Sequence, residues 1–203
     1  ILLANVLYDD VKKYVARENV FVCPNGIPEL INENPTARRY NEVPRILFLS
    51  NLIISKGVLV LLDALVILKN RSVCFACDFV GGETDELNAE SFANEVKKRG
   101  IEENVFYAGR KYGSEKKAYF ENADIFAFPT FYHNEAFPLV NIEAMQYKLP
   151  IVSTNEGGIP DMVVDGENGL VCQRQNAESL ANALENLLLD ENLRVKYGEN
   201  GYK

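Results

Sequence analysis

Short apolar runs alternate with longer amphipathic stretches along most of this chain. The apolar runs are rich in Val, Ile and Phe and predict buried strands, whereas the stretches between them have the apolar spacing of helices. Strands are expected at residues 20–23, 45–50, 73–80, 104–107, 125–128, 151–153 and 170–172. Helices are expected at residues 6–15, 58–69, 87–98, 115–122, 139–147 and 177–189. This alternation predicts an α/β fold, in which a Rossmann-like parallel sheet carries helices on both faces.

The size and charge of the chain narrow the range of functions. Its 203 residues suit one globular domain with a large core, and a net charge of −8 argues against a nucleic-acid surface. No apolar run reaches the length of a membrane span, and no signal-peptide pattern opens the chain. Residues 31–44 are polar and bounded by prolines, which predicts a loop before the sheet. Because the chain starts at Ile1 and its methionines lie deep in the sequence, we expect it to belong to a longer protein.

Two of the four cysteines, Cys74 and Cys77, have the C-x-x-C spacing of redox and zinc sites. A zinc site of four ligands would need further cysteines or histidines nearby, but Cys23 and Cys172 are distant in sequence and His133 is the single histidine. Both members of the pair fall in a predicted buried strand, which favours core packing. Unpaired thiols are typical of a reducing compartment, so a cytoplasmic location is expected.

The segment after the predicted strand 125–128 carries the clearest chemistry. Glu135 lies in a polar loop, Pro138 stands where a helix should begin, and Glu143 lies inside that helix. Proline suits the first helical position because its missing N–H needs no partner there. The backbone amides of Leu139 and Val140 would then face an anion at the positive end of the helix. Carboxylate, helix start and carboxylate thus follow the order of sugar, diphosphate and ribose in a nucleotide sugar.

The position of Glu143 supports this order. It lies four residues beyond Leu139, a rise of about 6 Å along a helix, which is close to the separation of a diphosphate from the ribose hydroxyls. A glutamate on a helix is usually a solvated residue, and the surrounding motif is what favours a ligand role. Lys56 lies near a predicted helix start, where a cation is poorly stabilised, and this favours an anionic partner for it.

Further motifs occur in order along nearly the whole chain. Glu135 and Glu143 form an E-x7-E motif, and the other motifs are VCPNGI at 22–27, ILFLSNLIISKG at 46–57, FVGG at 79–82, GGIPD at 157–161 and DGENGLV at 165–171. In these motifs the chain resembles the retaining GT-B glycosyltransferases of glycosyltransferase family four. The resemblance implies one half of a GT-B fold, with residues 1–18 as a helical segment at the interdomain crossover and residues 19–203 as the C-terminal nucleotide-sugar-binding domain.

The same resemblance implies a reaction and a partner domain. The reaction is transfer of a glycosyl group from a nucleoside-diphosphate sugar to an acceptor, with retention at the anomeric carbon and without a metal or other cofactor. An N-terminal acceptor domain of the same enzyme would lie outside this chain, so the isolated chain is expected to bind donor without transferring sugar. The base, the sugar, the acceptor and the oligomeric state remain open.

The resemblance also assigns roles to individual residues. Glu135 and Lys56 are the expected catalytic residues, with Glu135 on the sugar hydroxyls and Lys56 on the diphosphate, while Arg110 and Lys111 lie near the base. The full set of expected donor-binding residues is Asn51, Gly81, Arg110, Ala136, Phe137, Pro138, Leu139, Val140 and Glu143. Asn51 stands where most relatives carry arginine, so one of two usual diphosphate cations is missing.

Two other functions are alternatives to glycosyl transfer. A dinucleotide-dependent oxidoreductase would need G-x-G-x-x-G after its first strand, but the strand at 45–50 leads into Asn51 and Lys56. A nucleotide-sugar-binding module that has lost catalysis stays open, because Asn51 carries no charge. No Asp-x-Asp motif is present, so a metal-held diphosphate is not indicated.

Overall fold

A single parallel sheet forms the centre of the protein. The computed structural model describes residues 1–29 and 41–203, and in them six strands pair in the order β3-β2-β1-β4-β5-β6. The strands are β1 (Arg45–Leu49), β2 (Ala76–Val80), β3 (Val105–Gly109), β4 (Ile125–Phe128), β5 (Ile151–Ser153) and β6 (Gly169–Val171). The predicted loop at 31–44 lies largely outside the described residues. All five neighbouring pairs are parallel, which confirms the predicted α/β class.

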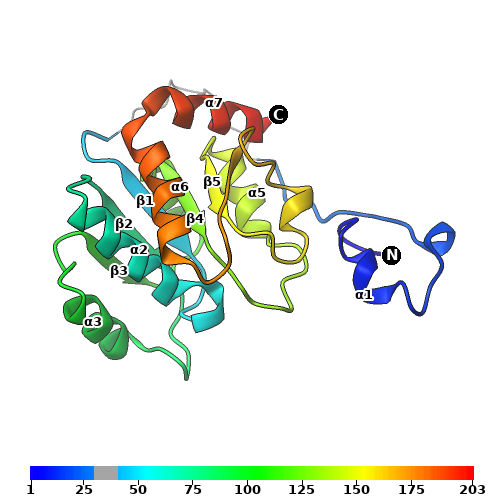
Figure 1. Ribbon diagram of the computed structural model, residues 1–203, viewed down its shortest axis with the longest axis horizontal. Coiled ribbons are helices and arrows are strands. Elements are labelled where there is room, and N and C mark those ends of the chain that lie inside the picture. The colour runs from blue at the N-terminus through cyan, green and yellow to red at the C-terminus, as the bar shows by residue number, and fades with distance from the viewer. Residues whose placement is uncertain (30–40) are drawn as a thin grey trace.

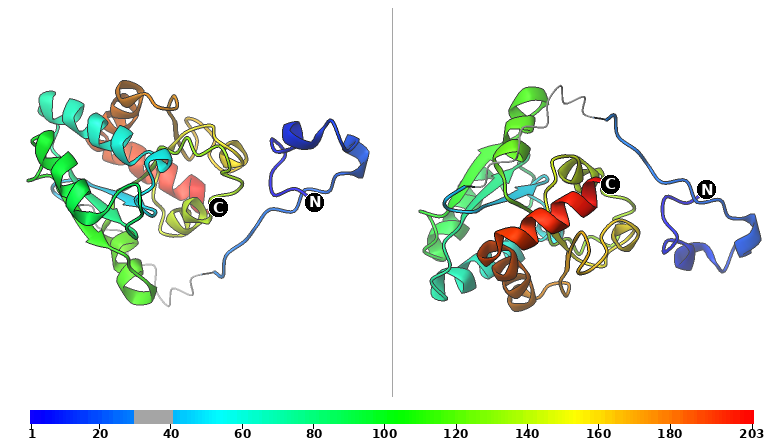
Figure 2. Two further views of the ribbon diagram at one scale, coloured as in Figure 1. Left: turned by 90° about the horizontal axis from the view of Figure 1, so that it is seen from below. Right: turned by 90° about the horizontal axis from the view of Figure 1, so that it is seen from above.

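Helices cover both faces of the sheet (Figures 1 and 2). One face carries α2 (Val58–Asn70), α3 (Ala89–Lys98) and α6 (Ala177–Leu189), and the other carries α4 (Gly113–Asn122) and α5 (Leu139–Gln146). Single 3-10 turns are η1 (Arg17–Asn19), η2 (Ile54–Lys56) and η3 (Ile159–Asp161). In the part of the chain that the structure describes, no helix is both long and apolar enough to cross a membrane.

The strands are buried because helices exclude water from both sides of them. Every residue of β2 and β4 is buried, which explains why their sequences are nearly continuous apolar runs. Aromatic rings fill the centre of the core: the centroids of Phe48 and Phe79 lie 5.2 Å apart, and those of Phe126 and Phe128 lie 6.4 Å apart. This packing fixes the carboxyl ends of the strands, where the loops of the candidate site begin.

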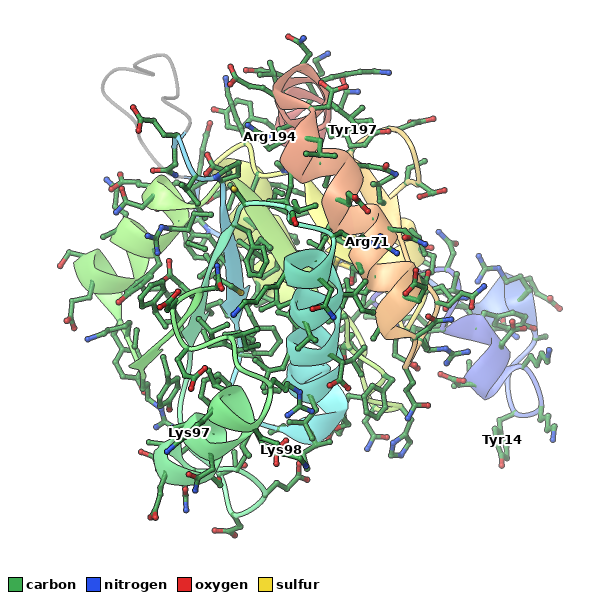
Figure 3. The ribbon with its side chains drawn as sticks, turned by 60° about the vertical axis from the view of Figure 1, so that its left-hand side comes forward. Tyr14, Arg71, Lys97, Lys98, Arg194 and Tyr197 are labelled. Carbon is green, nitrogen blue, oxygen red and sulfur yellow. The ribbon has the colours of Figure 1, made fainter. Side chains whose placement is uncertain are left out.

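The C-terminal helix α7 (Glu191–Tyr202) was not predicted from the sequence. Its buried residues are Arg194, Tyr197 and Gly198 rather than aliphatic side chains, so the helix lacks the apolar periodicity on which the prediction relied (Figure 3). Arg194 donates hydrogen bonds to the carbonyls of Leu187 (2.7 Å) and Leu188 (3.1 Å), and so satisfies the last carbonyls of α6.

A second arginine, Arg71, joins α2 to α6. Arg71, just past the end of α2, donates to Asn182 (2.8 Å) and Glu185 (2.5 Å) and pairs with Glu178, all on α6 (Figure 3). Because the three acceptors lie about one turn apart, they share one face of α6. The contact holds these two helices side by side on one face of the sheet (Figure 1).

The N-terminal segment differs from the prediction. The helix expected at 6–15 is reduced to α1 (Tyr8–Val11), and the strand expected at 20–23 is a single parallel bridge between Leu2 and Val22. A strand needs several paired residues on a neighbouring segment, and the few residues before α1 supply a single pair. The segment stands beside the sheet domain (Figures 1 and 2) and touches it through Asn5, whose backbone N–H donates to Asp161 at 2.5 Å.

The strand predicted at 73–80 begins at Ala76, three residues late. Cys74 therefore precedes the strand and is exposed, so the interpretation of core packing is wrong for Cys74 and right for the buried Cys77. Ser72 has a positive φ of 59° and forms a turn with Arg71, and residues 73–75 after this turn belong to no helix or strand. The boundaries of the other predicted elements from β1 to α6 agree within two residues.

Two of the four thiols are exposed and two are buried, so a thiol reagent can count the exposed ones. Burial raises the pKa of Cys172 to about 12 and raises the pKa of Cys77 well above its ordinary value, whereas Cys23 and Cys74 are exposed. Since the thiolate is the reactive form, we expect Ellman's reagent at about pH 8 to modify Cys23 and Cys74 in the folded protein and all four thiols in guanidinium. A Cys74→Ser variant should lose one equivalent. Modification of Cys77 or Cys172 without unfolding would contradict this burial.

Candidate functional site

The order of the strands reverses between β1 and β4. From β1 the chain builds outward to β2 and β3, then returns to β4 on the other side and continues to β5 and β6. Loops that leave the carboxyl ends of strands at such a point diverge and leave a crevice, where ligands of open α/β sheets bind. The loop after β1 carries Lys56 and the loop after β4 carries Glu135. The sheet thus brings together the two expected catalytic residues.

The two loops are fastened to each other by backbone contacts. The N–H of Phe131 donates to the carbonyl of Ser55 at 2.8 Å. Gly57, at the start of α2, has a positive φ of 89°, and a Cβ added there would lie 2.2 Å from the carbonyl oxygen of Pro129. A larger residue would force the loops apart, which explains the need for glycine directly after Lys56.

Lys56 and Glu135 form a nearly buried ion pair. The Lys56 Nζ lies 2.6 Å from a carboxylate oxygen of Glu135, and the side chains are 14% and 9% exposed. The Thr130 hydroxyl donates to the same oxygen at 3.4 Å, and the Tyr132 ring centroid lies 4.3 Å from the lysine nitrogen. Lys56 is the last residue of the turn η2 and lies just before the start of α2, not within its first turn. Thr130 and Tyr132 were missed because neither stands at a diagnostic spacing.

The loop after β5 supports the backbone of the Glu135 loop. The N–H of Gly158 donates to the carbonyl of Ala136 at 2.9 Å, and Phe137 packs against the core. Gly157 has a positive φ of 51°, and a Cβ added there would lie 1.5 Å from the carbonyl oxygen of Glu135. The Gly157-Gly158 pair, which the sequence offered as a motif without a role, therefore lets this loop approach and position Glu135.

The start of α5 corrects one detail of the prediction. Pro138 precedes the helix as its N-cap with an extended backbone (ψ 103°), and Leu139 is the first helical residue. Because the first amides of a helix have no carbonyl partner within it, the N–H groups of Leu139 and Val140 have none within α5, and their role in holding an anion stays a prediction. Leu139 is partly exposed, so this helix start is open to solvent.

Glu143 is paired with a lysine that the sequence did not single out. The Nζ of Lys116, in the first part of α4, lies 2.7 Å from each of the two carboxylate oxygens of Glu143. Both side chains are about one quarter exposed. Both glutamates of the E-x7-E motif are thus neutralised by a lysine from another element. Lys116 is one of two adjacent lysines on a polar helix, and no spacing marked it.

A cavity of about 390 Å³ lies beside this pair, at the carboxyl ends of β1 and β2. Its lining includes four of the expected residues, Asn51, Gly81, Arg110 and Lys111. The full lining is Leu49, Ser50, Asn51, Val80, Gly81, Arg110, Lys111, Tyr112 and Lys116, and none of these described residues is acidic. This cavity is therefore a local cationic site on an acidic chain.

Two of the lining side chains are placed by the turn after β2. Asn51 accepts a hydrogen bond from the N–H of Gly82 at 3.0 Å, so its carbonyl oxygen is occupied and its amide nitrogen remains a donor. The Arg110 guanidinium packs on Gly82, where an added Cβ would meet it at 2.3 Å. The Tyr107 hydroxyl donates to the carbonyl of Gly81 at 2.9 Å, and burial, reinforced by Glu83, raises the pKa of Tyr107. This turn holds Arg110 in the lining of the cavity.

A larger cavity of about 750 Å³ lies elsewhere, between α4 and the outer strands. Arg45, Asp78, Phe106 and Tyr119 contribute to its lining, and Lys111 is the one expected site residue that reaches it. Among the described residues, no group of three or more His, Cys, Asp or Glu side chains could hold a metal ion. Asn51, Gly81, Arg110 and Lys111 thus line the smaller cavity, while Lys56, Glu135 and Glu143 lie in the two ion pairs.

The fold and the site together define the class of the protein. A parallel sheet with helices on both faces, and a crevice at its switch point, is the Rossmann-like domain found in GT-B glycosyltransferase structures. Residues 31–203 match the family described as Glycosyl transferases group 1. The chain belongs to this family.

Three similar proteins illustrate the match. The capsular polysaccharide biosynthesis glycosyltransferase CapM of Staphylococcus aureus is 38% identical over 93 residues, which is 46% of this chain and 24% of CapM. The C-terminal domain of LpcC, a glycosyl transferase group 1 family protein from Francisella tularensis, superposes with a TM-score of 0.70 and 25% identity over 78% of this chain and 82% of that one. HepE of Anabaena, in complex with UDP and glucose, gives a TM-score of 0.68 and 21% identity over 78% and 42%. The chain spans between about a quarter and about half of the length of the curated relatives it matches.

The Lys56–Glu135 pair makes a testable contribution to stability. Lys56→Met leaves a nearly buried carboxylate without a partner and should lower the free energy of unfolding in urea by about 3 kcal/mol. Lys12→Met, which removes an exposed ion pair with Asp9, should change it by less than about 0.5 kcal/mol. The double variant Lys56→Met with Glu135→Gln should lose less than the sum of the single changes. Equal, small effects of the two lysine variants would contradict the account.

Proposed function

We propose that this chain is the donor-binding half of a retaining glycosyltransferase of the family-four type, which transfers a sugar from a nucleoside diphosphate to an acceptor. The observation that carries the proposal is the row formed by Glu135, the free amides at the start of α5, and Glu143 at the switch point of the sheet. These groups can contact a sugar, a diphosphate and a ribose in that order. Family membership and the UDP bound to HepE support a nucleotide-sugar donor.

The nucleotide would lie across the carboxyl edge of the sheet. The base enters the cavity of about 390 Å³ beside Arg110 and Gly81, where Lys111 and Tyr112 also line the wall. The ribose hydroxyls donate to the Glu143 carboxylate. The diphosphate accepts hydrogen bonds from the amides of Leu139 and Val140, and the positive end of α5 favours its charge.

Lys56 and Glu135 would act at the reacting end of the donor. Glu135 accepts hydrogen bonds from the sugar hydroxyls, and Lys56, already fixed by Glu135, faces the diphosphate. The bond between the anomeric carbon and the phosphate oxygen breaks while the acceptor oxygen bonds to the same face of that carbon, and the acceptor proton passes to the departing diphosphate. The protein stabilises charge on this leaving group through Lys56 and the start of α5.

A second domain would supply the acceptor site. Ile1, Tyr14 and Phe21 in the N-terminal segment expose large apolar side chains, and the bridge between Leu2 and Val22 leaves outer backbone edges free for further pairing within the described residues. Such a segment is suited to complete the sheet of a neighbouring domain. Since holding the acceptor against the donor supplies about 7–11 kcal/mol of the barrier, this chain alone would bind donor without transferring sugar.

A non-catalytic nucleotide-sugar-binding module is the alternative function. One observation favours it: Asn51 is uncharged and its carbonyl oxygen is engaged by Gly82. The glycosyltransferase function is better supported, because Lys56 and Glu135 are both present and in contact, and similar proteins are named as glycosyltransferases.

Nucleotide affinity tests the proposal. A thermal-shift panel of UDP, GDP, ADP and dTDP with their sugar conjugates identifies the preferred base, since a ligand at a hundred times its Kd stabilises by about 2.7 kcal/mol. For that ligand, Glu143→Ala should weaken binding in calorimetry by about 1–3 kcal/mol, because a charged acceptor is lost. Glu121→Ala, on the exposed side of α4, is the matched control. Absence of any binder would overturn the donor-binding function, and unchanged affinity in Glu143→Ala would overturn the ribose role.

A further inference from the structure

The pair between Lys116 and Glu143 occupies the position that the proposed function gives to ribose. The lysine nitrogen lies 2.7 Å from both carboxylate oxygens, so it sits symmetrically in front of the carboxylate. A vicinal diol that donates one hydrogen bond to each oxygen needs the same place. Lys116 and the ribose therefore compete for the front of Glu143, and the lysine has to move when the nucleotide binds.

The surroundings of Lys116 offer one direction for that movement. Its side chain lines the cavity of about 390 Å³, where Arg110 and Lys111 are the other cations and no described lining residue is acidic. A displaced ammonium group has no other carboxylate in this cavity to pair with. It gains a partner there when the ligand brings an anion.

The phosphate position is within reach of the same side chain. Leu139, whose amide opens α5, lies four residues before Glu143, which is a rise of about 6 Å. The flexible four-carbon stem of a lysine can move its nitrogen over such a distance by rotation about side-chain bonds. The helix α4 need not shift for the ammonium group to pass from Glu143 toward a phosphate.

We propose that Lys116 is a phosphate-binding residue that exchanges Glu143 for the phosphates of the bound nucleotide. In the ligand-free site it neutralises Glu143, and in the complex the ribose hydroxyls take the carboxylate while Lys116 binds a phosphate oxygen. The exchange leaves neither charged group without a partner, because the carboxylate accepts hydrogen bonds from the hydroxyls and the ammonium group pairs with an anionic phosphate oxygen. Lys116 would also supply a cation to the phosphates, which the uncharged Asn51 does not. The inference rests on the proposed function, because it takes the ligand to be a nucleoside diphosphate.

The next residue in the helix provides a matched control. Lys117 pairs with Glu121 at 3.3 Å, and both of these side chains are about half exposed. Lys116→Met and Lys117→Met remove the same charge from adjacent positions of α4. Lys116→Arg keeps the charge at the first position, and Lys116→Gln is a polar substitute if the methionine variant does not fold.

The experiment compares ligands that differ only in phosphate. The affinities of the preferred nucleoside, its monophosphate and its diphosphate are measured by calorimetry, with competition for the weak nucleoside. Lys116→Met should weaken the diphosphate at least about tenfold, while the nucleoside binds equally well or more tightly because its competitor for Glu143 is gone. Lys116→Arg should retain most of the preference for phosphate, and Lys117→Met should bind all three ligands as the unaltered chain does.

The outcomes separate this inference from the proposed function. An equal loss for nucleoside and diphosphate would show that Lys116 only positions Glu143, and it would overturn the exchange. Unchanged diphosphate affinity in both Lys116→Met and Lys116→Gln would overturn it as well. Failure of the unaltered chain to bind any nucleotide would instead overturn the proposed function and the exchange with it.

Discussion

The ion pair between Lys56 and Glu135 forms across the point where the strand order reverses, and the geometry of the candidate site depends on it. Both side chains are nearly buried, and the contact matters because an unpaired buried charge is strongly unfavourable. The pair requires the loops after β1 and β4 to touch, and this is possible because Gly57 and Gly157 leave room for neighbouring carbonyl groups. The sheet brings the loops to one edge, and the glycines and the ion pair fix their spacing.

The same pairing principle extends along the start of α5. Glu143 is neutralised by Lys116 as Glu135 is by Lys56. The candidate site therefore holds one ion pair before the start of α5 in sequence and one ion pair within α5. Under the proposed function, a chain of net charge −8 would bind an anion through local cations and backbone amides rather than through its overall field. Since Lys116 is more exposed than Lys56, the end of the site at Glu143 is the easier one to rearrange.

Much of this could be predicted from the sequence, because the fold follows from periodicity. Strands and helices from β1 to α6 were predicted within three residues, and the family resemblance assigned Lys56 and Glu135 to one catalytic site. The misses have physical causes. Helix α7 buries Arg194 and Tyr197 through hydrogen bonds and packing that leave no apolar pattern, and Lys116 becomes part of the site only through a tertiary contact with another helix.

The most direct test of the donor site is a nuclear magnetic resonance titration of the nitrogen-15-labelled chain with the preferred nucleoside diphosphate. If the start of α5 holds the diphosphate, the largest amide shifts should occur at Leu139 and Val140, with further shifts at Gly81 and Gly82 beside the base cavity. Shifts confined to residues around the larger cavity, such as Phe106 and Tyr119, would contradict the account.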